Sequence, residues 1–269
     1  MENAIEAHNN GPALVWGSGG DAYDKISRQI GSALDHCVLR IDPKPGERIL
    51  DLATGTGWTS RLLARCGATV TGADLSEDLV AAARARARAE GLDITYEIGD
   101  AEKLPYPDGT FDGVVSTFGV MFASRPEAAA SEMARVCRKG GRLGLATWAS
   151  KGSVYEMFVV MRPYMPAPAN PAPPSPFAWG SRERVQELLG HDFDLKFEDG
   201  VTVYYDRDGE AAWTAFSTGY GPTKSLAAKL DDQRRSDLRR DFAAFHDRFA
   251  TSLGFALPRE YLLTVGVRR

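Results

Sequence analysis

Hydrophobic positions in the first half of the chain alternate between short strand-like runs and helically spaced sets. The expected strands are residues 48–53, 69–73, 93–98, 111–116 and 142–148. The expected helices are residues 21–39, 58–66, 77–90 and 127–138, the first of which carries Tyr23, Ile26, Ile30, Leu34 and Val38 at helical spacing. Strands separated by helices predict a mixed α/β fold, with a parallel sheet covered by helices on both faces.

The pattern changes after residue 148. Residues 163–176 contain seven of the chain's 15 prolines, a density that excludes a continuous helix or a central strand. We expect a loop that leaves the sheet here, either as part of a site or as a spacer. Beyond it the pattern predicts a helix at 182–189, a strand within 195–205, a helical segment at 209–255 and a terminal strand at 260–267.

Composition and charge narrow the class of protein. The 269 residues are 43% hydrophobic and 25% charged, as in ordinary globular domains. The net charge of -4 gives no overall attraction to phosphate backbones, so we expect no nucleic-acid partner. Cys37, Cys66 and Cys137 are widely spaced and have no clustered histidines, which favours reduced thiols over a disulfide framework or a metal site.

The N-terminal sequence and the hydropathy pattern bear on location. The first 17 residues contain no basic segment followed by an apolar run. No apolar stretch approaches the roughly 18 residues that a membrane-spanning helix needs. We therefore expect a cytoplasmic protein without a membrane span.

A glycine loop follows the first expected strand. Gly55 and Gly57 lie between that strand and the helix at 58–66, where the absence of a Cβ lets the backbone approach a ligand closely. The loop predicts a nucleotide-like or adenosine-like ligand, or else only a tight turn. Ser60 stands where a dinucleotide-binding fingerprint has its third glycine, and the bulky Trp58 opens the helix, so a pyrophosphate is disfavoured.

Acidic residues end the next two strands. Asp74 comes 17 residues after Gly57, at a spacing suited to a carboxylate that accepts hydrogen bonds from ribose hydroxyls. Asp100 and Glu102 follow the third strand as a second acidic pair. Alone, Asp74 and Asp100 would also fit as helix N-caps. Together with the glycine loop they favour ligand binding.

These motifs, in this order, carry a family resemblance. They are the runs DLATGTG (51–57), GDAEKLP (99–105), DGTFD (108–112), ARV (134–136) and KGG (139–141), with Asp74 between the first two. The chain resembles the class I S-adenosylmethionine-dependent methyltransferases over residues 23–148, most closely the group typified by ubiquinone and menaquinone biosynthesis methyltransferases. The resemblance implies a Rossmann-like, doubly wound sheet of seven mostly parallel strands whose last strand is antiparallel. Ala53 stands where many members carry the first glycine of the loop.

The resemblance implies a cofactor, S-adenosylmethionine, with S-adenosylhomocysteine as product. Asp51 and the loop of Ala53, Gly55, Thr56 and Gly57 would hold its methionine portion. Asp74 would bind the ribose, Leu75 would flank the adenine, and Asp100, Ala101 and Glu102 would bracket the adenine edge. Thr117 and Phe118 would lie near the sulfonium, and Tyr23 would close over the cofactor unless it only packs on its helix.

The acceptor site is expected in the parts outside the common core. Large apolar side chains there suit a small lipophilic or aromatic acceptor, or else form the core of a cap. The candidates are Trp16, Met121, Phe122, Phe177 and Trp179. We expect apolar shape rather than charge to govern the choice of acceptor, with Lys224 as the one cation that an anionic group there could meet.

The expected organisation is a single methyltransferase domain over residues 1–269. A helical arm (1–45) precedes the cofactor-binding core (46–148), which is followed by a proline-rich cap loop (149–180) and the end of the sheet (181–269) with a helical insertion at 209–255.

The expected chemistry is direct in-line methyl transfer to a small-molecule acceptor. A sulfonium needs no metal, and none of His8, His36, His191 and His246 is assigned as a general base. Two alternatives remain open at this stage: a module that binds the cofactor without catalysis, and a nicotinamide-dependent oxidoreductase. The acceptor, the atom that is methylated and the oligomeric state also remain open.

Overall fold

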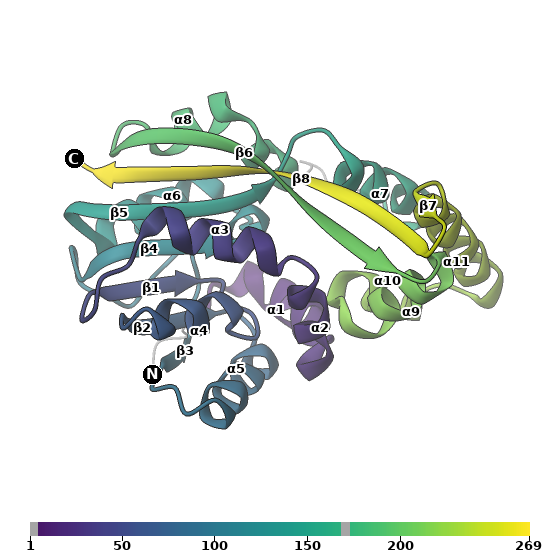
Figure 1. Ribbon diagram of the computed structural model, residues 1–269, viewed down its shortest axis with the longest axis horizontal. Coiled ribbons are helices and arrows are strands. Elements are labelled where there is room, and N and C mark those ends of the chain that lie inside the picture. Colours follow the sequence, from purple (N-terminus) through teal and green to yellow (C-terminus); the bar gives the residue numbers. More distant parts are fainter. Residues whose placement is uncertain (1–4, 168–172) are drawn as a thin grey trace.

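The computed structural model describes residues 5–167 and 173–269. A single sheet runs through its centre in the order β3-β2-β1-β4-β5-β8-β6, with the short strand β7 added beside β8 (Figure 1). The strands are β1 (Arg48–Leu52), β2 (Thr69–Asp74), β3 (Thr95–Ile98), β4 (Phe111–Thr117), β5 (Cys137–Trp148), β6 (Phe193–Asp206), β7 (Ala250–Thr251) and β8 (Gly254–Arg268).

The strand directions confirm the predicted fold class. The five strands β1 to β5 pair in parallel. The last strand, β8, pairs antiparallel with both β5 and β6. The chain steps outward from β1 to β2 and β3, and then returns to place β4 on the other side of β1. In such sheets ligands bind at the carboxyl ends of the strands where the order reverses, here β1 and β4.

Helices cover both faces of this sheet (Figure 1). The helices α3 (Gly31–Ile41) and α4 (Trp58–Arg65) lie on one face, and α6 (Pro126–Val136) and α8 (Arg182–Leu189) lie on the other. The helix α5 (Glu77–Ala89) packs beside β2 and β3. The central strands are buried between these layers, so their side chains are apolar in a nearly continuous run: Ile49, Leu50, Val114, Val115, Leu143 and Leu145 are fully buried.

A second group of helices extends the molecule beyond the carboxyl ends of the strands. It consists of α7 (Ser153–Met161), α9 (Gly209–Gly219), α10 (Gly221–Lys229) and α11 (Asp232–Asp247), into which the long strands β6 and β8 project (Figure 1). The N-terminal helices α1 (Asn10–Gly17) and α2 (Tyr23–Arg28) lie between this group and the sheet. Short 3₁₀ turns complete the fold: Ala7–Asn9, Gly20–Ala22, Val120–Phe122, Arg162–Tyr164 and Pro176–Gly180.

Several predicted elements differ from the structure. The single helix predicted at 21–39 is wrong: α2 ends at Arg28, Ile30 leaves helical geometry with φ -112° and ψ 12°, and α3 begins at Gly31. Glycine is a weak helix former, and the break frees the carbonyl of Gln29, which accepts a hydrogen bond of 2.8 Å from Arg259. The helices α1 and α7 were not predicted.

The C-terminal boundaries also differ. The helical segment predicted to reach residue 255 ends at Asp247, and β8 begins at Gly254, before the predicted start at 260. Antiparallel pairing explains the longer strand, because β6 supplies partners for β8 from Phe255 to Arg268. The predicted proline-rich loop includes residues 168–172, which lie outside the described residues.

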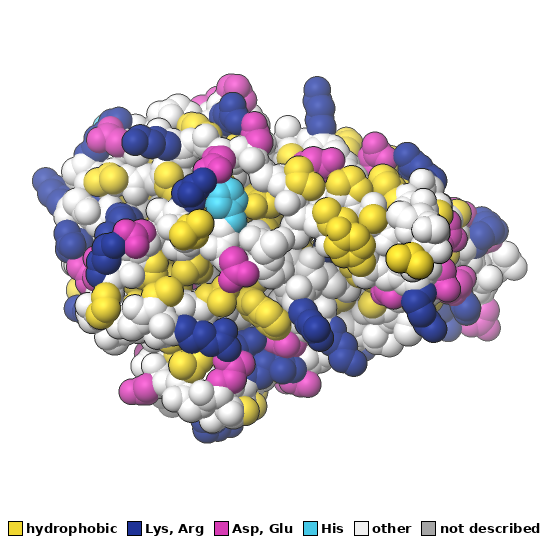
Figure 2. Space-filling model, viewed as in Figure 1, with side chains coloured by type: hydrophobic (Ala, Val, Ile, Leu, Met, Phe, Trp, Pro, Cys, Tyr) yellow, Lys and Arg dark blue, Asp and Glu magenta, His cyan; other side chains and the backbone are white. Residues whose placement is uncertain are grey.

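The surface mixes charges of both signs. Figure 2 shows Lys and Arg side chains lying beside Asp and Glu side chains over the visible face. Hydrophobic side chains gather in the same view where β6 and β8 project towards the second group of helices. The large exposed apolar residues of these two strands are Val201 and Tyr205 on β6 and Val267 on β8, and Leu253 lies exposed just before β8.

Candidate functional site

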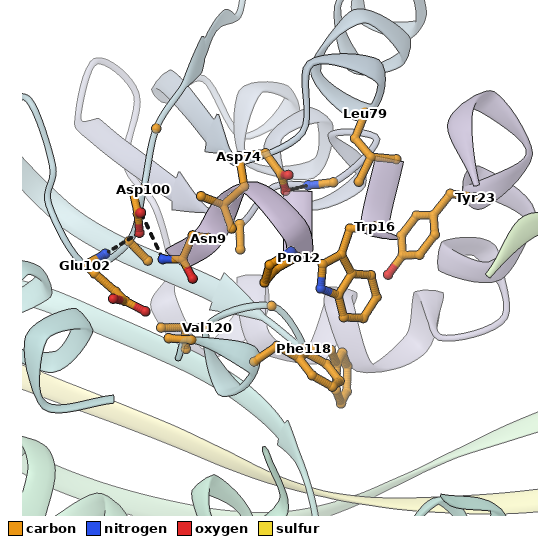
Figure 3. A pocket seen from close by; sticks show the side chains of 18 residues that line it. Asn9, Pro12, Trp16, Tyr23, Asp74, Leu79, Asp100, Glu102, Phe118 and Val120 are labelled. Carbon is orange, nitrogen blue, oxygen red and sulfur yellow. Dashed lines mark hydrogen bonds between the residues drawn. The ribbon is translucent and has the colours of Figure 1, made fainter. Parts of the chain in front are cut away.

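A pocket opens at the carboxyl ends of β1, β2, β3 and β4 (Figure 3). Its walls come from the loops that follow these strands and from the N-terminal segment that includes α1. The lining residues are Asn9, Pro12, Trp16, Tyr23, Ala53, Gly55, Asp74, Leu75, Leu79, Gly99, Asp100, Ala101, Glu102, Phe118, Gly119, Val120, Phe122 and Ala123.

The loop after β1 is shaped by positive φ angles. Ala53, Gly55 and Gly57 have φ of 56°, 57° and 75°, a conformation that favours glycine. A Cβ on Gly57 would lie 2.3 Å from the hydroxyl oxygen of Tyr96, so no larger residue fits there without a shift. A Cβ on Gly55 would meet the ring of Tyr23 at 3.5 Å. The loop therefore turns tightly below the ring of Tyr23.

Asp51 orders this loop from behind. Its Oδ2 accepts hydrogen bonds of 2.6 Å from the hydroxyls of both Thr54 and Ser60. Burial raises the pKa of Asp51 to about 6, against the effect of these two donors. Asp51 does not line the pocket. Ser60, the residue that replaces a third glycine, thus anchors the loop to the end of β1.

Asp74 faces the pocket from the end of β2. Its Oδ2 accepts a 2.8 Å hydrogen bond from the backbone N–H of Gly55 (Figure 3). Its Oδ1 accepts one of 2.9 Å from the backbone N–H of Ser76. Burial raises its pKa, opposed by these backbone donors. The N-cap of α5 is Ser76, whose hydroxyl accepts a hydrogen bond from Leu79. The alternative role of Asp74 as a helix N-cap is therefore excluded.

Asp100 and Glu102 form the opposite edge of the pocket and bind the N-terminal segment. Oδ2 of Asp100 accepts hydrogen bonds from the backbone N–H of Glu6 at 3.0 Å and from Nδ2 of Asn9 at 2.9 Å. The imidazole of His8 lies 2.7 Å from Oε2 of Glu102. Burial alone would raise the pKa of Glu102, but hydrogen bonds from Arg125 and His8 hold it below its usual value. The sequence analysis missed Asn9, which lies in a segment without a recognisable motif.

A second pocket adjoins the first across a wall of aromatic side chains. Trp16, Tyr23, Phe118 and Phe122 line both pockets. The ring centroids of Trp16 and Phe122 are 4.7 Å apart. The remaining residues of the second pocket are Ile26, Ile30, Trp148, Val154, Met157, Phe158, Tyr204, Phe216, Tyr220, Leu257 and Arg259. It is a largely apolar chamber between α2, the second group of helices and the paired strands β6 and β8.

The first pocket brings together most of the predicted cofactor residues. Those that line it are Tyr23, Ala53, Gly55, Asp74, Leu75, Asp100, Ala101, Glu102 and Phe118. Asp51, Thr56, Gly57 and Thr117 lie behind its surface. Among them, Thr56 donates a 3.1 Å hydrogen bond to Asp24, and the hydroxyls of Thr117 and Thr59 are 2.7 Å apart.

The predicted acceptor residues divide into two groups. Trp16 and Phe122 line both pockets, whereas Met121, Phe177 and Trp179 line neither. These three are buried in the main hydrophobic core, as in the alternative interpretation of a cap core. Lys224 is exposed and lines neither pocket, and its Nζ donates a 2.6 Å hydrogen bond to the carbonyl of Ser18.

Arg259 is the charged residue that the sequence analysis missed. Buried residues alternate with less buried ones over residues 254–261 of β8, and Phe255, Leu257, Arg259 and Tyr261 occupy the buried positions. An arginine at an inward position of an alternating strand was the available signal.

Comparisons with known proteins place the chain in a family. A model of the methyltransferase domain matches residues 50–145. An uncharacterized protein of Mycobacterium tuberculosis is 40% identical over 229 residues, which cover 84% of this chain and 82% of that protein. The demethylmenaquinone methyltransferase of Beutenbergia cavernae is 41% identical over 147 residues, or 51% of this chain and 60% of that protein.

Solved structures agree with the fold. The YcgJ protein of Bacillus subtilis matches with a TM-score of 0.61 at 20% identity, over 88% of this chain and 98% of that one. A putative methyltransferase of Bacillus halodurans matches with a TM-score of 0.61 at 21% identity, over the same shares of the two chains. At these identities the likeness concerns the fold alone.

The doubly wound sheet, the glycine loop and the acidic strand ends define an S-adenosylmethionine-dependent methyltransferase. The chain belongs to the methyltransferase domain family, and its cofactor is S-adenosylmethionine. Within residues 5–167 and 173–269, no helix is both long and apolar enough to span a bilayer. The same residues contain no cluster of His, Cys, Asp and Glu suited to a metal ion.

Proposed function

We propose that this methyltransferase acts on a small, largely apolar or aromatic acceptor that binds in the second pocket. The observation that carries this proposal is the aromatic wall of Trp16, Tyr23, Phe118 and Phe122, which is shared by the two pockets. A cofactor in the first pocket and an acceptor in the second would meet at this wall.

The residues of the first pocket fit the cofactor. Asp74 presents a carboxylate that would accept hydrogen bonds from the ribose, and Leu75 and Ala101 offer apolar surface for the adenine. Asp100 offers a carboxylate to the adenine edge, and the close turn at Gly55 leaves backbone accessible to the methionine portion. When bound, S-adenosylmethionine supplies a methyl group already activated on its sulfonium.

The protein's own contribution is then alignment and exclusion of water. Aromatic rings line the junction of the two pockets: the ring centroids of Trp16 and Phe122 are 4.7 Å apart, and Tyr23 stacks on Tyr220 with centroids 6.3 Å apart. Burial raises the pKa of Tyr23, Tyr204 and Tyr220, so their phenols stay protonated near neutral pH.

The second pocket lacks a general base among the described residues that line it, which include no His, Asp, Glu, Lys or Cys. An acceptor bound there must be nucleophilic without deprotonation by the pocket, or must arrive already ionised. The demethylmenaquinone methyltransferase relative supports a ring-shaped acceptor, although its match covers only about half of this chain.

Two measurements test the proposal. Calorimetry should show binding of S-adenosylhomocysteine, and a screen of apolar and aromatic acceptors should yield S-adenosylhomocysteine from S-adenosylmethionine. Phe122→Ala should then raise the acceptor KM or lower kcat, whereas Phe177→Ala, a matched loss of a buried aromatic outside both pockets, should leave the acceptor KM unchanged. Cofactor binding without any turnover would favour the non-catalytic module, and selective binding of NAD would favour the oxidoreductase.

A further inference from the structure

One buried cation faces the second pocket. Arg259 is 5% exposed and is the only Lys, Arg, Asp, Glu or His among the described residues that line this chamber. Its neighbours on the same face of β8 are Leu257 and Tyr261, both buried. The charge therefore sits in otherwise apolar surroundings.

The guanidinium of Arg259 is only partly satisfied by the protein. Its Nη2 donates a 2.8 Å hydrogen bond to the carbonyl of Gln29, and its Nε has no partner among the described residues. It lies over the rings of Tyr204 and Trp148, 4.9 and 5.8 Å from their centroids. Within the described chain no carboxylate forms an ion pair with it. Burial lowers its pKa to about 10, which leaves it charged at neutral pH.

Another buried arginine provides a contrast. Arg61 is 4% exposed, and it pairs with Asp24 at 3.3 Å and with Glu90 at 3.0 Å. A buried charge without a counter-ion is strongly unfavourable, so buried arginines are normally paired in this way. Arg259 has aromatic faces and one carbonyl where Arg61 has two carboxylates.

We propose that Arg259 is the binding residue for an anionic group on the acceptor, specifically two oxygens that share one negative charge, as in a carboxylate or an enolised 1,3-dicarbonyl. The inference rests on the proposed function, because it names the acceptor class of that pocket. The planar guanidinium matches such an oxygen pair in a bidentate geometry. Its buried Nε–H has no partner among the described residues. An acceptor that arrives ionised also accounts for a pocket without a general base.

The test uses probes that do not depend on knowing the natural acceptor. Benzoate represents a carboxylate, dimedone an enolised dicarbonyl, and benzamide a neutral molecule of similar shape. Their binding to the full chain is measured by calorimetry with saturating S-adenosylhomocysteine. We expect at least one of the two anions to bind about ten-fold or more tightly than benzamide. Equal binding of all three probes would overturn the proposal.

Variants assign the effect to Arg259. Arg259→Met should abolish the preference for the anion, and Arg259→Lys should retain part of it, because the charge stays while the planar fork is lost. Arg207→Met removes an exposed positive charge and should leave the preference intact. If Arg259→Met does not fold, Arg259→Lys and the wild-type comparison still decide the question. An anion preference that survives the loss of the guanidinium contradicts the proposal.

The cofactor measurement separates this proposal from the function on which it rests. Arg259 lines only the second pocket, so Arg259→Met should bind S-adenosylhomocysteine with wild-type affinity. Failure of the wild-type protein to bind S-adenosylhomocysteine would overturn the proposed function, and the anion preference measured without it would still test Arg259. Normal cofactor binding without an anion preference would overturn the Arg259 proposal alone.

Discussion

The side-chain amide of Asn9 donates a hydrogen bond of 2.9 Å to Asp100, and so ties the N-terminal segment to the loop that follows β3. The same carboxylate oxygen accepts the backbone N–H of Glu6, and Oδ1 of Asn9 accepts a hydrogen bond from Ser124. Asn9 thus joins three parts of the chain at the rim of the first pocket. The N-terminal segment therefore forms one wall of the first pocket.

We predict that this segment is a cover whose order depends on the cofactor. Hydrogen exchange of residues 5–23 should slow when S-adenosylhomocysteine binds, because Asn9, Pro12, Trp16 and Tyr23 line the pocket. Asn9→Ala removes the link to Asp100 and should reduce this protection, while the exchange of β1 and β4 in the core stays unchanged. Identical exchange with and without the ligand would count against a cover.

Asp74 provides a second test, of the cofactor site. Asp74→Ala removes a pocket carboxylate and should weaken S-adenosylhomocysteine binding by about 1–3 kcal/mol, the range for a lost charge-assisted hydrogen bond. Asp194→Ala, which removes an exposed carboxylate on β6 that pairs with Arg269, should bind as the wild type does. Calorimetry at low salt measures both, and unchanged affinity in Asp74→Ala would show that the ribose assignment is wrong.

The structure changes the expected effect of removing Trp179. Sequence analysis placed this residue against the acceptor, but it is 2% exposed in the core and its carbonyl accepts a hydrogen bond from Thr147. We now expect Trp179→Ala to lower the free energy of unfolding by about 3–5 kcal/mol, as large core deletions do, and to leave the acceptor KM of the folded fraction unchanged. Chemical denaturation combined with kinetics checks this, and a raised KM at near wild-type stability would restore Trp179 to the pocket.

The sheet was predictable because burial on both faces of a parallel sheet requires nearly continuous apolar runs. In β1, for example, residues 49–52 are all buried, and Asp51 is the only polar residue among them. The glycine loop and the acidic strand ends were also recognisable, since backbone geometry at Gly55 and Gly57 restricts the residue type. These signals are local in the sequence. The family resemblance that they carry led to nine predicted residues that line one pocket.

The acceptor side was less predictable because its residues come from distant segments. Trp179 and Phe122 are both large and apolar, and only packing decides which one faces a cavity. The carbonyl of Gln29, at the break before Gly31, accepts a hydrogen bond from Arg259, which is 230 residues away in sequence. Lys224 was predicted as the cation near the acceptor from its position in the sequence. In the structure Arg259 on β8, which pairs with β6, lines the second pocket instead.

A final prediction concerns the stability of the helical group at low pH. His246 on α11 is fully buried beside Phe242, and its Nδ1 donates a 2.8 Å hydrogen bond to the carbonyl of Phe242. Burial lowers its pKa from 6.5 to about 4. Well above pH 6.5 the imidazole is neutral in both the folded and the unfolded state, and it adds no pH dependence.

Between pH 6.5 and pH 4 the unfolded chain takes up a proton that the folded His246 refuses, so the free energy of unfolding falls by roughly 3 kcal/mol over this window. His246→Gln does not titrate and should flatten that slope, whereas His191→Gln, an exposed position, should keep it. Urea denaturation at about pH 7.5, 6, 5 and 4 gives the comparison.

Asp51 acts in the opposite direction, because its raised pKa of about 6 stabilises the fold as the pH falls towards 4. It contributes equally to all three proteins, so the difference between variant and wild type isolates His246. Parallel curves for His246→Gln and the wild type would mean that His246 has the same pKa in the folded and unfolded states, which contradicts the prediction.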